Sequence, residues 1–155
     1  MSVKIKQLTE TYDNLSAVDI LDTLILKWNF IEKLQEQLKN QSKPNKELTI
    51  FTESRKEELA VQVLKVYDNA KKEMEICEGG MKTCDTAMGF HIYAARWNTL
   101  ADRFEKLKRF GFNYADSLSN VCKEHALKAL SRSRQSGGLF GRLKEKIKNF
   151  VTTCS

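Results

Sequence analysis

The chain has 155 residues, of which 41% are apolar and 30% are charged, a composition typical of a soluble globular protein and too apolar for a disordered one. Because no apolar run approaches the roughly 20 residues needed to cross a bilayer, a membrane-spanning helix is excluded, and the N-terminus lacks the apolar stretch of a secretory signal. The formal net charge of +6 is confined to residues 119–155, which carry eight basic and two acidic side chains, whereas residues 1–118 carry equal numbers of both.

The first strong helical pattern runs from about residue 17 to residue 40. Ser16 is expected to cap this helix, with Asp19 as an acid in its first turn. Its apolar side chains recur at alternating spacings of three and four, which places them on one helical face: Leu21, Leu24, Trp28, Ile31 and Leu38. Pro44, in a polar segment, prevents the helix from continuing. Residues 1–15 are expected either to add one helical turn or to stay loose.

Three further helices are expected along the chain. The second begins between residues 46 and 52 and is predicted to end at Gly79 and Gly80, since glycine favours a helix C-terminus. The third extends from near residue 83 to residue 110, where Gly111 ends it, and its apolar stripe consists of Phe90, Tyr93, Trp97, Leu100, Phe104 and Leu107. A weaker apolar stripe over residues 113–130 predicts the fourth. Joined by short loops, these helices predict an all-α protein in which residues 1–130 form an antiparallel four-helix bundle of up-down-up-down topology.

The character of the sequence changes after Leu130. Residues 131–138 are polar and end in two glycines, which predicts a flexible Ser/Arg/Gly linker. Residues 139–151 then fit a basic amphipathic fifth helix. At 100° per residue, its six large apolar side chains fall within an arc of about 120°. These side chains and four cations form the predicted binding face: Leu139, Phe140, Leu143, Ile147, Phe150 and Val151, with Arg142, Lys144, Lys146 and Lys148.

An apolar arc with lysines at its edges is typical of helices that lie on an anionic membrane surface. The same helix would also fit a hydrophobic groove on a partner protein, or pack on the bundle as an ordinary fifth helix. Nucleic-acid binding by the basic C-terminal region is less well supported, because Phe140 and Phe150 lie on the apolar arc and cannot stack on bases while the lysines contact phosphates. We therefore predict a non-enzymatic interaction protein, an adaptor, regulator or effector-like protein.

No motif in the sequence indicates catalysis or a bound cofactor. The chain has no phosphate-binding glycine loop and no nucleophilic serine elbow. Cys84 with His91, and Cys122 with His125, have helical spacing, but no CxxC pair accompanies them, so neither a metal site nor a small-molecule substrate is expected. Four cysteines in a helical chain of this size are typical of free thiols in a reducing compartment. We therefore expect a cytoplasmic protein, peripheral to a membrane if the terminal helix docks there.

Overall fold

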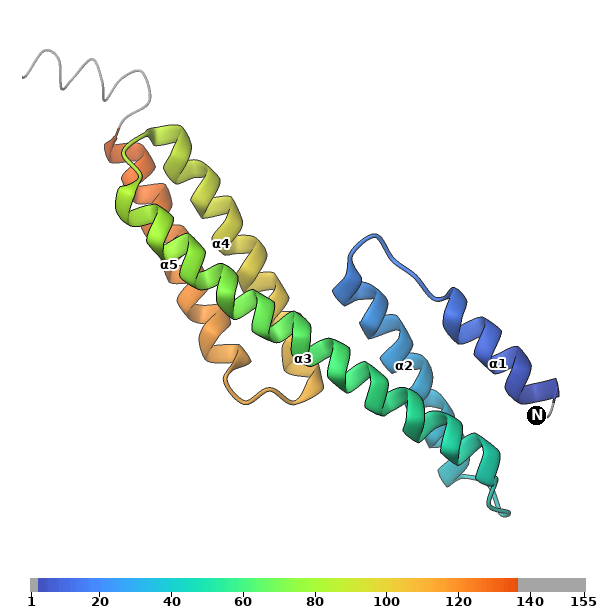
Figure 1. Ribbon diagram of the computed structural model, residues 1–155. Coiled ribbons are helices and arrows are strands. Elements are labelled where there is room, and N and C mark those ends of the chain that lie inside the picture. The colour runs from blue at the N-terminus through green and yellow to red at the C-terminus, as the bar shows by residue number, and fades with distance from the viewer. Residues whose placement is uncertain (1–2, 137–155) are drawn as a thin grey trace, which may run out of the picture. The chain divides into compact units, whose positions relative to one another are not determined.

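The computed structural model describes residues 3–136, and these residues form α-helices joined by loops and one 3₁₀ turn (Figure 1). The predicted all-α class is confirmed. The helices are α1 (Val3–Asn14), α2 (Ile20–Lys39), α3 (Lys46–Thr83), α4 (Ala87–Leu107) and α5 (Ala115–Gln135), with the 3₁₀ turn η1 (Lys108–Phe110) following α4. None of these described helices is both long and apolar enough to cross a membrane. The fifth helix predicted over residues 139–151 lies outside the described residues.

The described residues divide, between Tyr67 and Asp68, into two compact units, which we call the N-terminal unit and the C-terminal unit. The N-terminal unit contains α1, α2 and the first part of α3. The C-terminal unit contains the rest of α3, together with α4 and α5. A single up-down-up-down four-helix bundle over residues 1–130 is therefore not confirmed. An amphipathic stripe shows that a helix buries one face, but it does not show which neighbour covers that face.

In the N-terminal unit, an aromatic cluster explains why α1 is a complete helix. Ile5 and Tyr12, seven residues apart on one face of α1, are both buried. The Tyr12 ring packs edge-on against Phe51 of α3, with 6.2 Å between ring centroids. Lys27 Nζ of α2 and Arg55 Cζ of α3 lie 4.9 and 5.5 Å from the centroid of the Tyr12 ring. The apolar face of α1 thus stabilises twelve helical residues, where the sequence predicted one turn at most.

The start of α2 lies three residues later than predicted because a different residue caps it. The Asp19 side chain accepts a hydrogen bond of 2.7 Å from the backbone N–H of Leu21, so Asp19 and not Ser16 occupies the N-cap. The end of α2 at Lys39 agrees with the predicted end near residue 40.

The glycine pair within α3 does not end this helix, contrary to the prediction. The helix passes through Gly79 and Gly80 and ends at Thr83. A Cβ atom at Gly80 would overlap the hydroxyl end of Tyr93 on α4, whereas a Cβ atom at Gly79 would meet no atom within 4 Å. Gly80 therefore marks a close approach of α3 and α4, and not a helix stop.

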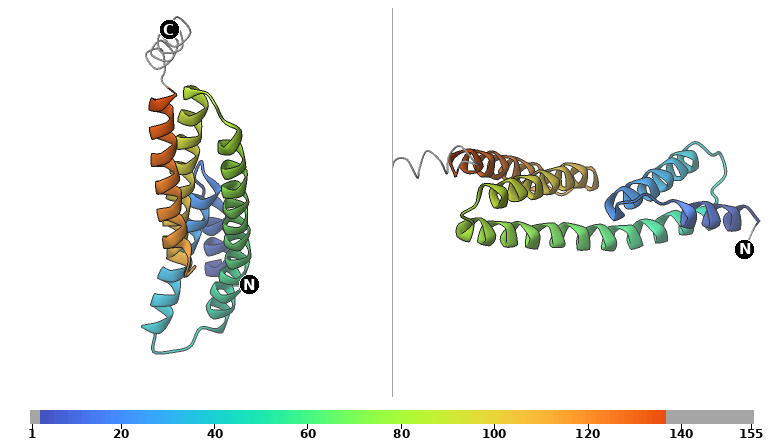
Figure 2. Two further views of the ribbon diagram at one scale, coloured as in Figure 1. Left: turned by 90° about the vertical axis from the view of Figure 1, so that its left-hand side faces the viewer. Right: turned by 90° about the horizontal axis from the view of Figure 1, so that it is seen from above.

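In the C-terminal unit, α4 and α5 run side by side along their length (Figure 2). On α4 the fully buried side chains include Trp97 and Phe104. The facing positions of α5 carry small residues: Ala115, Ser119, Cys122, Ala126 and Ala129. Small side chains on one helix leave room for large aromatic ones on the other, so the two backbones pack closely. The 3₁₀ turn η1 is followed by Gly111, whose φ of +86° is a left-handed conformation that favours glycine. This agrees with the predicted end of the helical segment at Gly111.

Helix α5 extends further than predicted. Residues 131–135, expected to be linker, form its last turn. The Ser133 hydroxyl donates a hydrogen bond of 3.0 Å to the carbonyl oxygen of Ala87, at the start of α4. This contact gives a polar residue a partner on the neighbouring helix. The polar composition of residues 131–138, which predicted a linker, does not indicate such a contact.

Candidate functional site

The ten side chains predicted to bind a membrane or a partner lie outside the described residues. They are Leu139, Phe140, Arg142, Leu143, Lys144, Lys146, Ile147, Lys148, Phe150 and Val151. The structure describes the surface from which this segment continues, at the end of the C-terminal unit where α5 ends. Two hollows lie on this unit, one between α3 and α5 and one between α3 and α4.

The hollow between α3 and α5, which we call the basic groove, has a volume of about 210 Å³. It is lined from α3 by Glu78, Met81 and Lys82, and from α5 by His125, Lys128 and Arg132. Three lysine or arginine side chains thus converge with one carboxylate, and all three cations are exposed. The Arg132 guanidinium also lies 6.0 Å from the ring centroid of Phe90, so this cation is held against the start of α4.

A buried tryptophan positions the floor of the basic groove. The indole ring of Trp97 stacks on the His125 imidazole, with ring centroids 4.4 Å apart and an interplanar angle of 20°. Its Nε1–H donates a hydrogen bond of 2.8 Å to the sulfur of Met81. The Glu78 carboxylate lies 3.7 Å from Nε2 of His125. The contacts beneath the groove therefore join side chains from all three helices of the unit.

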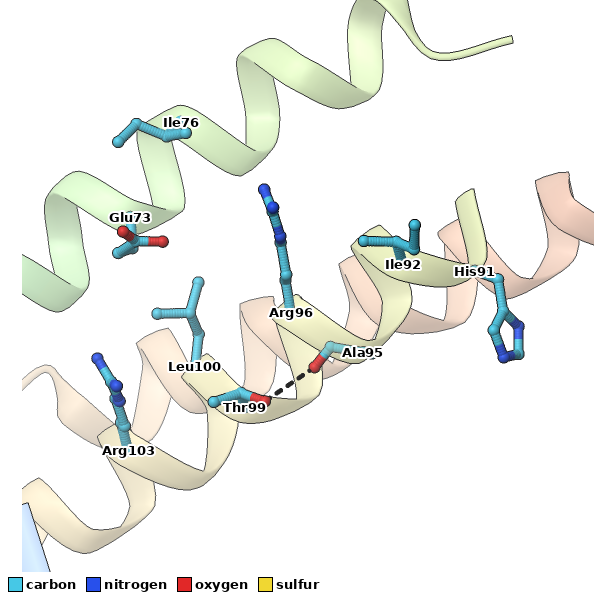
Figure 3. A pocket seen from close by; sticks show the side chains of 9 residues that line it. All are labelled: Glu73, Ile76, His91, Ile92, Ala95, Arg96, Thr99, Leu100 and Arg103. Atoms are coloured by element: carbon cyan, nitrogen blue, oxygen red, sulfur yellow. Dashed lines mark hydrogen bonds between the residues drawn. The ribbon is translucent and has the colours of Figure 1, made fainter. Parts of the chain in front are cut away.

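The larger hollow, which we call the α3–α4 groove, has a volume of about 610 Å³ (Figure 3). It is lined by Glu73 and Ile76 of α3 and by His91, Ile92, Ala95, Arg96, Thr99, Leu100 and Arg103 of α4. Figure 3 shows Arg96 and Arg103 rising from α4 on the side that faces α3, while the His91 ring points away from them. The Thr99 hydroxyl donates to the Ala95 carbonyl oxygen at 3.0 Å, so its polar group has a partner within α4.

The cysteines and histidines considered as metal ligands are not gathered into a site. Residues 3–136 contain no group of three or more His, Cys, Asp or Glu side chains placed to hold a metal ion. Burial raises the pKa of the Cys122 thiol to about 12, and burial likewise raises the pKa of Cys77. Both thiols therefore stay protonated near neutral pH, whereas nucleophilic attack and metal binding require the thiolate.

The sequence predicts neither groove. Ile92 is the clearest missed signal, because it lies between Phe90 and Tyr93 and outside the predicted apolar stripe of its helix. Ile76 is likewise outside the apolar stripe that predicts α3, which consists of Leu59, Val63, Val66, Ala70, Met74 and Cys77. An apolar residue on the solvent side of a helix is common when it stands alone, so only the structure shows that these two line one hollow.

Comparison with known proteins adds no assignment: no protein-family model matches the chain, and neither a curated protein nor a solved structure matches it significantly.

Proposed function

We propose that this chain is a non-enzymatic interaction protein, an adaptor, regulator or effector-like protein, that docks on an anionic membrane through its basic C-terminal region. The observation that carries the proposal is the concentration of net charge in residues 119–155, combined with the apolar arc of residues 139–151. The basic groove supports it, since Lys82, Lys128 and Arg132 are exposed near the end of α5, from which the predicted helix continues.

The expected energies indicate separate roles for the apolar and the basic side chains. Burying six large apolar side chains contributes roughly 1.5–3 kcal/mol each before the cost of ordering the helix is subtracted. Each lysine or arginine near an anionic surface adds about 1 kcal/mol, and salt weakens this contribution. The apolar side chains therefore supply most of the binding free energy, while the cations select anionic lipid.

Co-sedimentation with vesicles tests the proposal. We expect the full chain to bind phosphatidylcholine vesicles that contain phosphatidylserine, and to bind pure phosphatidylcholine vesicles weakly. Truncation after Ser136 should remove most of the binding. Equal binding by the full and truncated chains, or no binding by the full chain to the anionic vesicles, would contradict membrane docking.

Removing the cations of the basic groove tests whether they contribute to vesicle binding beyond their effect on the net charge. Replacing Lys82, Lys128 and Arg132 with glutamine should weaken vesicle binding, since each contributes about 1 kcal/mol at most. The matched control replaces three cations on and after α2, which are also exposed: Lys33, Lys39 and Lys43. If both triple variants lose the same affinity, net charge alone directs the binding and the basic groove has no part in it.

The same preparations distinguish the other uses of the C-terminal helix. Binding to a protein groove would ignore lipid charge yet depend on Leu143, Ile147 and Phe150. Nucleic-acid binding would fall steeply with salt and would not change on Phe140→Ala or Phe150→Ala. A helix packed on the folded chain would make removal of residues 137–155 lower the melting temperature sharply.

A further inference from the structure

The α3–α4 groove exposes apolar surface that the C-terminal unit does not use for its own core. Ile76 is 60% exposed and Ile92 is 49% exposed, although they line the same groove from two different helices. Leu100, which is 3% exposed, also lines the groove and belongs to the core beneath it. Apolar side chains that converge in one hollow, with polar groups around them, are typical of a binding site and differ from isolated exposed residues.

The charged side chains of this groove indicate the chemistry of its ligand. Arg96 and Arg103 line it from α4, and neither guanidinium forms an ion pair with a carboxylate in the part of the chain that the structure describes. Arg96 lies 5.6 Å from the ring centroid of Tyr93. The acidic lining residue is Glu73 of α3. The groove therefore has an excess of guanidinium groups, which favour carboxylates as partners because their geometries match.

The spacing of the two arginines fits a helix. They are seven residues apart on α4, two helical turns, which corresponds to about 10.5 Å along the axis. Thr99, which lies between the two arginines, and Ala95, which precedes Arg96, have short side chains, so a second backbone can approach α4 closely there. A helix lying along the groove with carboxylates two turns apart reaches both guanidiniums, while its apolar face covers the two isoleucines. We propose that the α3–α4 groove binds an acidic amphipathic helix of a partner protein.

The charges also exclude the chain's own C-terminal segment as this ligand. Residues 137–155 contain four basic side chains and one acidic side chain, so they repel the groove's arginines. The basic region and the α3–α4 groove thus have ligands of different class, an anionic lipid surface and an acidic protein helix. The second site does not depend on the first.

The test uses the full chain and two synthetic helical peptides that differ only in charge. Both carry a leucine face, and one has glutamates two turns apart beside that face where the other has lysines. In fluorescence anisotropy we expect the glutamate peptide to bind and the lysine peptide to bind at least about tenfold more weakly. Arg96→Glu combined with Arg103→Glu should weaken binding of the glutamate peptide by about tenfold or more and should favour the lysine peptide.

Two further variants separate this groove from general effects. Lys33→Glu with Lys39→Glu reverses two exposed charges on α2 and should leave binding of the glutamate peptide unchanged. Ile92→Ser should weaken the binding of both peptides. Because the Ile92 side chain is half-exposed, the melting curve of this variant, followed by circular dichroism, should stay close to that of the parent chain.

The proposal is overturned if the two peptides bind equally, if the glutamate peptide does not bind, or if the double arginine variant binds it like the parent chain. It is also overturned if light scattering shows a dimer that the arginine variant dissociates, since a second copy would then be the ligand. Loss of binding to anionic vesicles by the arginine variant, with peptide binding unchanged, would assign these arginines to lipid instead.

Discussion

At the scale of single residues, one aromatic side chain organises the packing of each unit. Trp97 is fully buried in the C-terminal unit, where it contacts His125 by stacking and Met81 through its indole N–H. Tyr12 in the N-terminal unit lies near Lys27 and Arg55, each positioned over its ring. Cation–π contacts of this kind contribute about 0.5–1 kcal/mol at exposed sites and more when water is excluded. Burial of the aromatic rings contributes more of the stability than these contacts do.

Replacing Trp97 tests the role of the buried indole. Trp97→Ala should lower the free energy of unfolding by about 3–5 kcal/mol, because it leaves a cavity and removes the surface on which His125 stacks. Urea denaturation followed by far-ultraviolet circular dichroism measures the loss. Leu127→Ala, at a position that is 67% exposed, should change stability by less than about 0.5 kcal/mol. Similar losses in the two variants would contradict the burial of Trp97.

The buried thiol of Cys122 makes stability depend on alkaline pH. Burial raises its pKa from 9.0 to about 12, so in this range the unfolded thiol ionises while the folded thiol keeps its proton. The unfolded state then binds fewer protons, and the free energy of unfolding falls as the pH rises from 9 to about 12. Cys122→Ala should make this fall less steep in urea denaturation series with reductant present. Tyr12, whose burial raises its pKa to about 12, should continue to contribute in the variant.

A control for the pH series is Ser119→Ala, a buried position on the same helix that does not titrate. It should shift stability by a similar amount at every pH and leave the slope unchanged. If Cys122→Ala keeps the parent slope, another group causes the alkaline loss.

At the scale of helices, neighbouring elements and not local composition decide where several helices begin and end. The stripes of α2 and α4 were strong enough to predict these helices closely, because large apolar residues at helical spacing specify a buried face. The glycine pair in α3 and the polar turn at the end of α5 were misread. In both places α3 or α5 contacts α4: Gly80 lies against the Tyr93 side chain, and Ser133 donates a hydrogen bond to the Ala87 carbonyl oxygen. A local pattern does not contain that information.

The two glycines of α3 give a matched pair of opposite expectations. Gly79→Ala should stabilise the chain by up to about 1 kcal/mol, because alanine favours helix and its Cβ meets open space. Gly80→Ala should destabilise it, because the Tyr93 side chain must move to admit the new Cβ. Thermal denaturation of the two variants compares them directly. Adding Tyr93→Ala to the Gly80→Ala chain should recover part of the loss, and equal stability of the two glycine variants would refute the close approach.

At the scale of the whole molecule, the sequence predicts its helical class but not its division into two units. Leu21 and Trp97 fall on equally clear stripes, yet they belong to different units. The sequence does not predict the grooves either, because each is lined by residues of two different helices, and a stripe on one helix does not show which helix lies beside it. The concentration of charge near the C-terminus, in contrast, follows from the sequence alone, because counting charged side chains needs no knowledge of packing.

Hydrogen exchange should detect the two units separately. Ile31→Ala removes a fully buried side chain of the N-terminal unit and should reduce amide protection mainly in α1 and α2. Phe104→Ala, fully buried in the C-terminal unit, should reduce protection mainly in α4 and α5. Mass spectrometry of peptic fragments resolves the two regions. A uniform loss across the described helices in both variants would show that the units unfold together.

The placement of the two tryptophans gives the chain a separate optical reporter for each unit. Trp28 belongs to the N-terminal unit, with Lys56 Nζ 4.9 Å from its ring centroid, and Trp97 belongs to the C-terminal unit. Trp97→Phe leaves emission from the first unit alone, and Trp28→Phe leaves emission from the second. Because Trp97 is fully buried and touches His125, its emission responds both to solvent entry and to events in the basic groove. Intrinsic fluorescence can therefore follow occupation of that groove without an attached dye.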